Sequence, residues 1–197
     1  MQEKNGKTVN VLTEIFPVNN CILLNLPSDS VLFDKIDYDS MGIIGYSQGG
    51  AGAICAVTNY ENGSCYKAMF TGSAAYPTLA KNMGWEYDAS KITIPYFMAA
   101  GTGKSDDSGN DPEKSYGGVS PLSSLIANYN SIGEDVQKVR ARAVGAEHEQ
   151  MLMRSDGYMT AWMLFLLSGD EEAGSVFVGE NAEILHNANW QDVEKNH

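Results

Sequence analysis

Residues 41–53 of the chain read MGIIGYSQGGAGA and carry its clearest structural signal. Met41 to Tyr46 form a short apolar run with two isoleucines, which predicts a buried strand. The run stops at Ser47, and Gly49 to Tyr60 then form a stretch rich in Gly and Ala that we interpret as a helix. We therefore expect a strand, a tight turn at Ser47 and a small-residue helix in direct succession.

The same alternation of short strands and helices continues toward the C-terminus. The expected strands are Tyr66–Thr71, Ile92–Ala100 and Val136–Val144, and the expected helices are Tyr76–Asn82, Pro121–Tyr129, Asp156–Leu167 and Ala182–His186. Strands that alternate with helices at this spacing are typical of parallel strands joined by crossover helices. The sequence thus predicts an α/β layered domain.

The first 40 residues give a weaker pattern. Val9 to Phe16 has the spacing of a helix, whereas Cys21 to Leu26 fits a helix or a strand equally well. No repeat, low-complexity tract or long Pro/Gly/Ser linker divides the chain. We therefore treat residues 1–197 as one domain.

Composition and charge exclude several classes of function. The 197 residues are 43% hydrophobic, which is enough for one core, and their formal net charge of −12 disfavours nucleic acid and anionic membrane surfaces as partners. No apolar run approaches the roughly 18 to 20 residues that span a bilayer. Met1 to Thr8 is polar where a signal peptide would be apolar, so export would require a signal upstream of Met1 and the localisation stays open.

The three cysteines give little information about compartment. Cys21, Cys55 and Cys65 are an odd number and form no C-x-x-C pair. We interpret them as small buried hydrophobic residues, with a Cys55–Cys65 disulfide as the alternative.

Gly45 to Gly49 read G-Y-S-Q-G and match the G-x-S-x-G pattern of a nucleophilic serine. Small residues on both sides allow the strand and the helix to approach closely, and the turn lifts the Ser47 hydroxyl clear of the sheet. The N–H of Gln48 then lies at a helix N-terminus, where it can stabilise an oxyanion. The alternative is a glycine-rich turn with a solvated serine.

A nucleophilic serine needs a base that takes its proton. The chain has three histidines, of which His197 is the last residue and His186 falls in a predicted helix. His148 follows the predicted strand Val136–Val144 directly, and the carboxyl ends of parallel strands are where catalytic groups gather. His148 is therefore the expected base.

The acid that orients the base is expected after the strand Ile92–Ala100. Asp106 is the first carboxylate beyond that strand and is our first choice, with Asp107 as the alternative. The order Ser47, Asp106, His148 along the chain is the order known for serine triads of this strand–turn–helix type.

Two other motifs compete for the loop after Ile92–Ala100. Gly101 to Ser105 looks like the end of a phosphate loop, but Met98 stands where its first glycine should be. The acidic stretch Asp106 to Glu113 could suggest calcium, but its glycine, Gly109, is misplaced for that pattern and no glutamate falls at its twelfth position. We expect a solvated loop with neither nucleotide nor metal.

The remaining aromatic residues suggest packing. Trp162 lies in the apolar helix Asp156–Leu167 and is expected in the core. Tyr46 and Trp85 either border an acyl pocket or pack against neighbouring elements.

Four stretches together resemble a known family. They are Gly45–Gly49, the G-T-G-x-x-D run at 101–106, the G-A-E-H run at 145–148, and the tail from Gly157 through Trp162 and Gly169-Asp170 to Trp190. From about residue 36 to 195, the chain resembles bacterial α/β-hydrolases of the cutinase and dienelactone-hydrolase type. The resemblance implies a three-layer α/β-hydrolase-type parallel sheet and a carboxylic-ester hydrolase that acts on small-molecule or polymeric esters without a cofactor. It also implies roles for Ser47 as nucleophile, Asp106 as acid and His148 as base.

The resemblance also implies a missing N-terminal part. In that fold four strands and two helices precede the nucleophile and need roughly 60 to 70 residues, but only 46 residues precede Ser47. Residues 1–40 also lack a His-Gly-Gly-Gly-type loop for a second oxyanion donor. We expect a chain that lacks the first strands and has an exposed edge beside the strand of Ser47, through which it could self-associate. The alternative function is a catalytically impaired fragment or association module.

Overall fold

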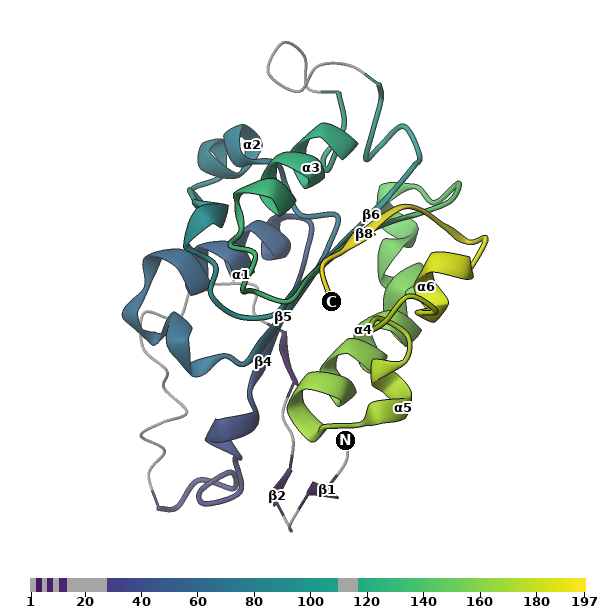
Figure 1. The fold of residues 1–197 in the computed structure, drawn as a ribbon. Helices are drawn as coiled ribbons and strands as arrows, with labels where there is room; N and C mark the ends of the chain where they lie inside the picture. The colour runs from purple at the N-terminus through teal and green to yellow at the C-terminus, as the bar shows by residue number, and fades with distance from the viewer. Residues whose placement is uncertain (1–2, 5–6, 9–10, 14–27, 110–116) are drawn as a thin grey trace.

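The computed structural model describes residues 3–4, 7–8, 11–13, 28–109 and 117–197, and within them the main sheet has six strands in the order β3-β4-β5-β6-β7-β8 (Figure 1). These strands are β3 Val11–Thr13, β4 Gly42–Tyr46, β5 Ala68–Gly72, β6 Tyr96–Gly101, β7 Lys138–Ala143 and β8 Trp190–Lys195. Strands β3 to β7 pair in parallel, and β8 pairs antiparallel with β7. A separate antiparallel pair joins β1 Glu3–Lys4 to β2 Lys7–Thr8. The predicted α/β class, with a mostly parallel sheet, is confirmed.

Helices cover both faces of the sheet. The α-helices are α1 Gln48–Asn59, α2 Pro77–Asn82, α3 Leu122–Ser131, α4 Met151–Ser168, α5 Glu171–Gly174 and α6 Glu183–His186, and the 3-10 helices are η2 Tyr38–Ser40, η3 Glu61–Cys65, η4 Ala89–Lys91 and η5 His148–Gln150. Figure 1 shows α1, α2 and α3 on one face and α4, α5 and α6 on the other. Helices α1 to α3 share a face because each connects neighbouring parallel strands by a crossover of the same hand. Among the described helices, none has the length and apolarity required to cross a membrane.

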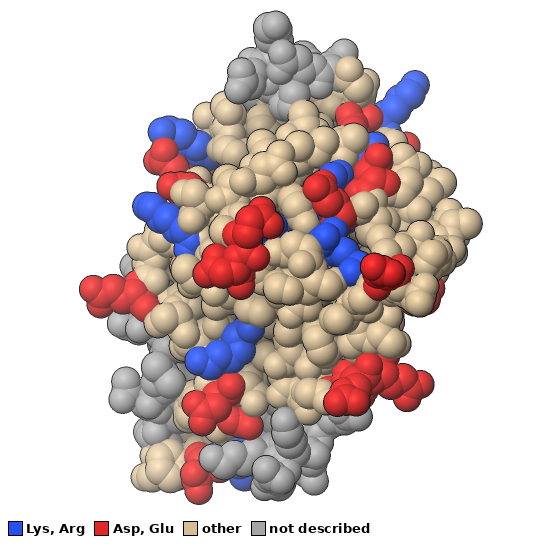
Figure 2. Space-filling view, in the orientation of Figure 1, with Lys and Arg blue, Asp and Glu red and all other residues tan. Residues whose placement is uncertain are grey.

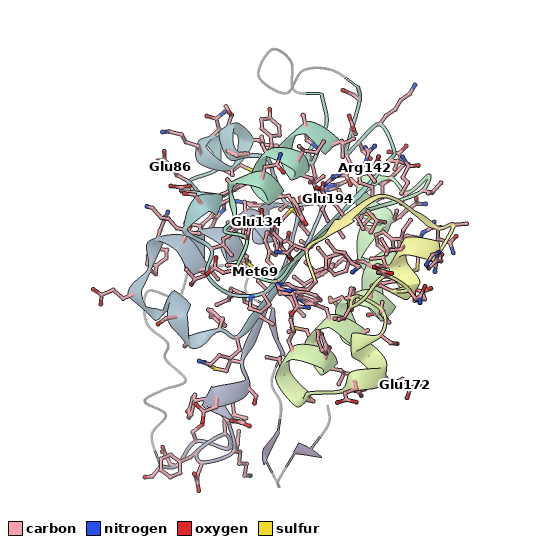
Figure 3. The ribbon with its side chains drawn as sticks, viewed as in Figure 1. Met69, Glu86, Glu134, Arg142, Glu172 and Glu194 are labelled. Atoms are coloured by element: carbon pink, nitrogen blue, oxygen red, sulfur yellow. The ribbon has the colours of Figure 1, made fainter. Side chains whose placement is uncertain are left out.

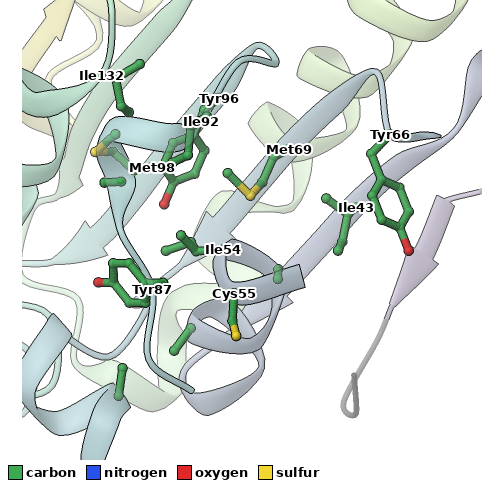
Figure 4. Packing of buried hydrophobic residues seen from close by; sticks show 14 of the residues in the cluster. Ile43, Ile54, Cys55, Tyr66, Met69, Tyr87, Ile92, Tyr96, Met98 and Ile132 are labelled. Carbon is green, nitrogen blue, oxygen red and sulfur yellow. The ribbon is translucent and has the colours of Figure 1, made fainter. Parts of the chain in front are cut away.

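Alternate residues of each strand supply two hydrophobic cores. Ile43 and Met69 pack with α1, and Figure 4 shows them in the same cluster as Ile54 and Cys55 of that helix. Their neighbours on the strands face the other way, toward α4. Trp162 of α4 is fully buried there and donates a hydrogen bond from Nε1 to the carbonyl oxygen of Met69 at 3.0 Å, which confirms its predicted core position. Burial on both faces explains why the strands read as continuous apolar runs.

Strand β7 differs because one of its faces carries buried cations, Lys138, Arg140 and Arg142. The ammonium group of Lys138 donates to two backbone carbonyls of the α3 region and lies 2.8 Å from Glu134 Oε1. Arg140 is paired with Glu194 of β8, and Arg142 is paired with Asp192 of the same strand. Figure 3 labels Arg142 of β7 and Glu194 of the neighbouring strand β8. On the face seen in Figure 2, most Lys and Arg side chains lie beside Asp or Glu. A buried charge needs such partners, and β8 supplies them for the two arginines of β7, whereas Glu134 supplies one for Lys138.

The structure corrects the prediction for the first residues. Val9 to Phe16 was expected to be helical, but its described part is strand β3, with Val11 opposite Gly42 and Thr13 opposite Ile44. A helix this short is marginal alone, whereas pairing with β4 satisfies the backbone of an otherwise open edge. The expected exposed edge beside the strand of Ser47 is therefore wrong, because β3 occupies it. Cys21 to Leu26 lies outside the described residues.

Later elements depart less from expectation. Helix α4 begins at Met151, five residues before the predicted Asp156, because a capping box between Glu147 and Gln150 starts the preceding turn η5. Strand β8 is a strand that the sequence pattern does not predict, since four of its six residues are polar and only Trp190 is buried. No disulfide joins Cys55 to Cys65, so that alternative is wrong; burial raises the pKa of the Cys55 thiol.

We predict opposite effects of alanine at two glycines. A Cβ on Gly45 would lie 2.3 Å from the Gly49 carbonyl oxygen, so Gly45→Ala should lower the free energy of unfolding by about 1–3 kcal/mol. Gly157 is exposed in α4 with nothing near a Cβ, so Gly157→Ala should raise it by about 0.5–1 kcal/mol. Urea unfolding measures both, and a Gly45→Ala protein as stable as the original chain would contradict the close approach of β4 and α1.

Candidate active site

The carboxyl ends of the parallel strands bring three predicted residues together. Ser47 follows β4 directly, Asp106 lies in the loop after β6, and His148 lies in the loop after β7. Ser47 Oγ is 2.8 Å from His148 Nε2, and His148 Nδ1 is 2.7 Å from Asp106 Oδ1. The side chains thus form one hydrogen-bonded chain across the end of the sheet, where parallel α/β sheets place their sites.

Ser47 has a strained backbone. Its φ of 57° and ψ of −123° are unfavourable for a residue with a side chain, and its N–H is held by the Gly72 carbonyl at 2.9 Å. Ser47 is also the N-cap of α1. Gln48 is the first residue of that helix, so its N–H has no acceptor within the helix and is available at the positive end of the helix dipole.

Asp106 is fully buried and accepts three hydrogen bonds. Its Oδ1 faces His148, whereas its Oδ2 accepts from the Gly101 N–H at 2.7 Å and from Ser73 Oγ at 2.5 Å. A carboxylate at Nδ1 of His148 favours the tautomer with its proton on Nδ1. Nε2 is then free to accept the proton of Ser47.

The neighbouring carboxylate, Asp107, faces a different partner. Its Oδ2 is 2.6 Å from Arg142 Nη1 and accepts the N–H of Leu122 at 3.2 Å. Of the two acids that the sequence left open, Asp106 is therefore the one bonded to His148. His186, the other candidate base in a helix, is exposed on α6 at the opposite face of the sheet from α1.

Two loops are fastened to each other around this site. The N–H and the hydroxyl of Ser105 both donate to Glu147 Oε2, the former at 2.9 Å, and Ser105 Oγ accepts the N–H of His148 at 2.8 Å. Gly101 lies so close to Ala146 that a Cβ there would be 2.2 Å from the Ala146 carbonyl oxygen. The acid loop, which carries Asp106 after β6, and the histidine loop, which carries His148 after β7, are therefore held together by hydrogen bonds and close packing. The two hydrogen bonds from Ser105 lower the pKa of Glu147.

Tyr46 supports the base from the side of β4. Its hydroxyl donates to the His148 carbonyl oxygen at 2.8 Å, and the two rings lie 4.9 Å apart with an angle of 31°. Burial raises the pKa of Tyr46, and the charges of Asp106 and Glu149 add to that effect. Trp85 packs near Gly52 of α1. Tyr46 thus packs against the histidine, one of the two roles considered for it.

Sequence reasoning missed several residues around the site. Ser73 is a polar residue in a bend and belongs to no motif, whereas Ser105 was considered only as part of a phosphate-loop-like stretch. Glu147 had a signal that could have been used, because it directly precedes the predicted base. Loops after the strands that flank a nucleophile often carry functional residues that belong to no motif.

The competing interpretations of the acid loop find no support in its geometry. Residues 106–109, the described residues that directly follow Ser105, form no helix, and the Ser105 N–H that a phosphate would need donates to the Glu147 carboxylate. Among residues 28–109 and 117–197, no three His, Cys, Asp or Glu side chains gather in a way that could hold a metal ion. Asp111 and Glu113 lie outside the described residues.

No protein-family model matches the chain, and no curated protein sequence matches it. The geometry of the site is therefore the basis for a functional assignment.

We predict that Glu147 stabilises the fold only above acidic pH. Its folded pKa is lowered from 4.5, so its contribution is present above about pH 4.5 and is lost as the pH falls through the folded value. Glu147→Gln should therefore lower the urea midpoint at pH 7, and the difference should shrink by pH 3.5. Glu180→Gln, at an exposed position, is the control. An equal deficit at both pH values would contradict the role of the carboxylate.

Proposed function

We propose that the chain is a serine hydrolase that cleaves carboxylic esters through an acyl-enzyme intermediate. The observation that carries the proposal is the continuous hydrogen-bonded chain from Ser47 through His148 to Asp106. The strained turn between β4 and α1 supports it, since such a turn presents a nucleophile above a sheet. We further propose that the sheet is of the α/β-hydrolase type, as the chain order of the three residues and the helices on both faces suggest.

The proposed reaction starts at Ser47. Its Oγ attacks the ester carbonyl carbon while His148 Nε2 takes the hydroxyl proton, and the electron pair of the carbonyl moves to its oxygen. The N–H of Gln48 stabilises that oxyanion. His148 then gives the proton to the leaving alcohol as the tetrahedral intermediate collapses to an acyl-serine. Water, activated by the same imidazole, releases the acid and restores Ser47.

Asp106 supplies the charge that this cycle needs. The imidazolium that forms during each proton transfer lies 2.7 Å from a carboxylate that solvent does not reach. Electrostatic interactions are stronger in such a place than in water, because less solvent screens them. The acid therefore favours the charged form of His148 at the stage where positive charge develops.

The proposed substrates are esters, either small or polymeric, and the mechanism requires no cofactor. A catalytically impaired hydrolase fragment or association module is the alternative. It would be favoured if the folded chain neither hydrolysed esters nor reacted with a fluorophosphonate. That outcome would follow if a second oxyanion donor were needed, because loss of one donor can cost about 10² to 10³ in rate. The segment after β3, residues 14–27, lies outside the described residues.

We predict that Ser47→Ala abolishes hydrolysis of p-nitrophenyl butyrate. Removal of a triad nucleophile costs up to about 10⁶ in kcat, because the covalent step is lost. A fluorophosphonate probe should label the original chain at Ser47 and leave the variant unlabelled. Ser131→Ala, which removes a hydroxyl bonded only within its own helix, should behave like the original chain. Hydrolysis that survives Ser47→Ala would exclude the proposed mechanism.

We predict different consequences for the two adjacent acids. Asp106→Asn should lower kcat by about 10⁴, because the amide favours the wrong histidine tautomer. Asp107→Asn should chiefly lower thermal stability, since it weakens the ion pair with Arg142. Steady-state kinetics and melting temperatures of both variants test the assignment. The reverse pattern would make Asp107 the acid.

A further inference from the structure

The carboxyl end of β5 carries a buried serine that no motif singled out. Strands β4, β6 and β7 lead to Ser47, Asp106 and His148, and β5, which lies between β4 and β6, leads to Ser73. Gly72, the last residue of β5, pairs with Tyr46 on one side and Ala99 on the other. Ser73 therefore lies at the level of the proposed nucleophile, and four successive parallel strands each lead to one polar side chain.

Ser73 is held tightly at this position. Its side chain is fully buried, and its N–H donates to the Ala99 carbonyl oxygen at 2.7 Å. Its φ of 48° lies in the left-handed region, which is unfavourable for a residue with a Cβ. Such backbone strain persists only where the surroundings impose it, and it is common at functional sites. Ser47, at the end of the neighbouring strand, has the same feature.

The hydroxyl of Ser73 donates to the proposed acid. Its Oγ is 2.5 Å from Asp106 Oδ2, which also accepts the Gly101 N–H, while Oδ1 is left to His148. An ionised carboxylate only accepts hydrogen bonds, so the Ser73 hydroxyl must be the donor. The two oxygens of Asp106 thus have different partners. Rotation of the carboxylate away from His148 would break the hydrogen bond from Ser73.

We propose that Ser73 is a positioning residue of the triad, which stabilises the ionised form of Asp106 and directs its Oδ1 at His148. This inference rests on the proposed function. Among the charged and titratable groups of the neighbouring elements, Tyr46 of β4 bonds the His148 carbonyl and interacts with Asp106 and Glu149. Asp107 of the acid loop pairs with Arg142 of β7, and Glu147 of the histidine loop bonds Ser105 and interacts with Lys104. None of these groups bonds to the Ser73 hydroxyl, so its removal leaves their charges in place.

Loss of the Ser73 hydroxyl should change the pH dependence of the proposed activity in a definite direction. The active state combines an ionised Asp106 with a neutral His148. In a variant without the Ser73 hydroxyl, this state loses a charge-assisted hydrogen bond to the carboxylate. The same bond contributes less when the pair is protonated, so its loss destabilises the active state more than the protonated one. Protonation of the pair is then easier, so the acidic side of the kcat/KM profile should move to higher pH by about one unit. At the pH optimum kcat should fall about tenfold with little change in KM, since no substrate contact is removed.

The test compares Ser73→Ala and Ser73→Gly with Ser155→Ala. Glycine relieves the positive φ, so a shared effect of Ala and Gly belongs to the hydroxyl rather than to the backbone. Ser155 is equally buried, but its Oγ donates only to a carbonyl of its own helix, which makes Ser155→Ala the matched control. The measurements are the pH profile of kcat/KM with p-nitrophenyl butyrate and the pH titration of the His148 ring signals by NMR.

The expected result is that both Ser73 variants shift the pH profile and the NMR midpoint upward, while the Ser155 variant shifts neither. Unshifted values in a folded Ser73→Gly protein would overturn the proposal. Failure of the proposed function is seen separately, as an original chain that neither hydrolyses the ester nor labels with a fluorophosphonate. In that case the NMR midpoint still decides whether Ser73 acts on the Asp106–His148 pair.

Discussion

The buried carboxylate of Asp106 is the group on which the site depends. A charge out of contact with water must be hydrogen-bonded, and its partners come from the ends of three strands: Ser73 after β5, Gly101 at the end of β6 and His148 after β7. Ordering this one group therefore fixes the spacing of three loops. The Ser47 hydroxyl joins the arrangement through His148, and the strained turn of Ser47 lies where β4 and α1 are in close contact.

A second set of charges, centred on Arg142 of β7, holds the loop that carries Asp106. Arg142 of β7 bonds both Asp107 in the acid loop and Asp192 in β8. Asp106 and Asp107 are adjacent in sequence, but one bonds the proposed base and the other this arginine, so the loop is held on both sides. The strand that completes the sheet and the loop that carries the proposed acid thus share one cation. The acidic residues of β8 fit this role, because Glu194 pairs with Arg140 and Asp192 pairs with Arg142.

Patterns of neighbouring residues in the sequence predicted the elements that short-range preferences determine. The apolar run before Ser47 and the small residues after it indicated β4 and α1 to within two residues, and the strand–helix alternation indicated the α/β class. Elements defined by their partners were missed: β3 is a strand because β4 offers an open edge, and β8 because β7 needs acids. The site shows the same division. Ser47 and His148 stand out in sequence, whereas the choice between Asp106 and Asp107 depends on side-chain direction, and Ser73 is recognisable only through its contact.

The hydrogen bonds of the proposed triad also bear on how the chain acquires its structure. Ser47 and His148 are 101 residues apart, and His148 and Asp106 are 42 apart, so both contacts close long loops. Closing a long loop costs conformational entropy, so we expect these two contacts to form late in folding. The ion pairs between β7 and β8 form only when the last residues of the chain have joined the sheet. A reagent that reads the geometry at Ser47 would therefore report on completed folding, and not merely on the presence of secondary structure.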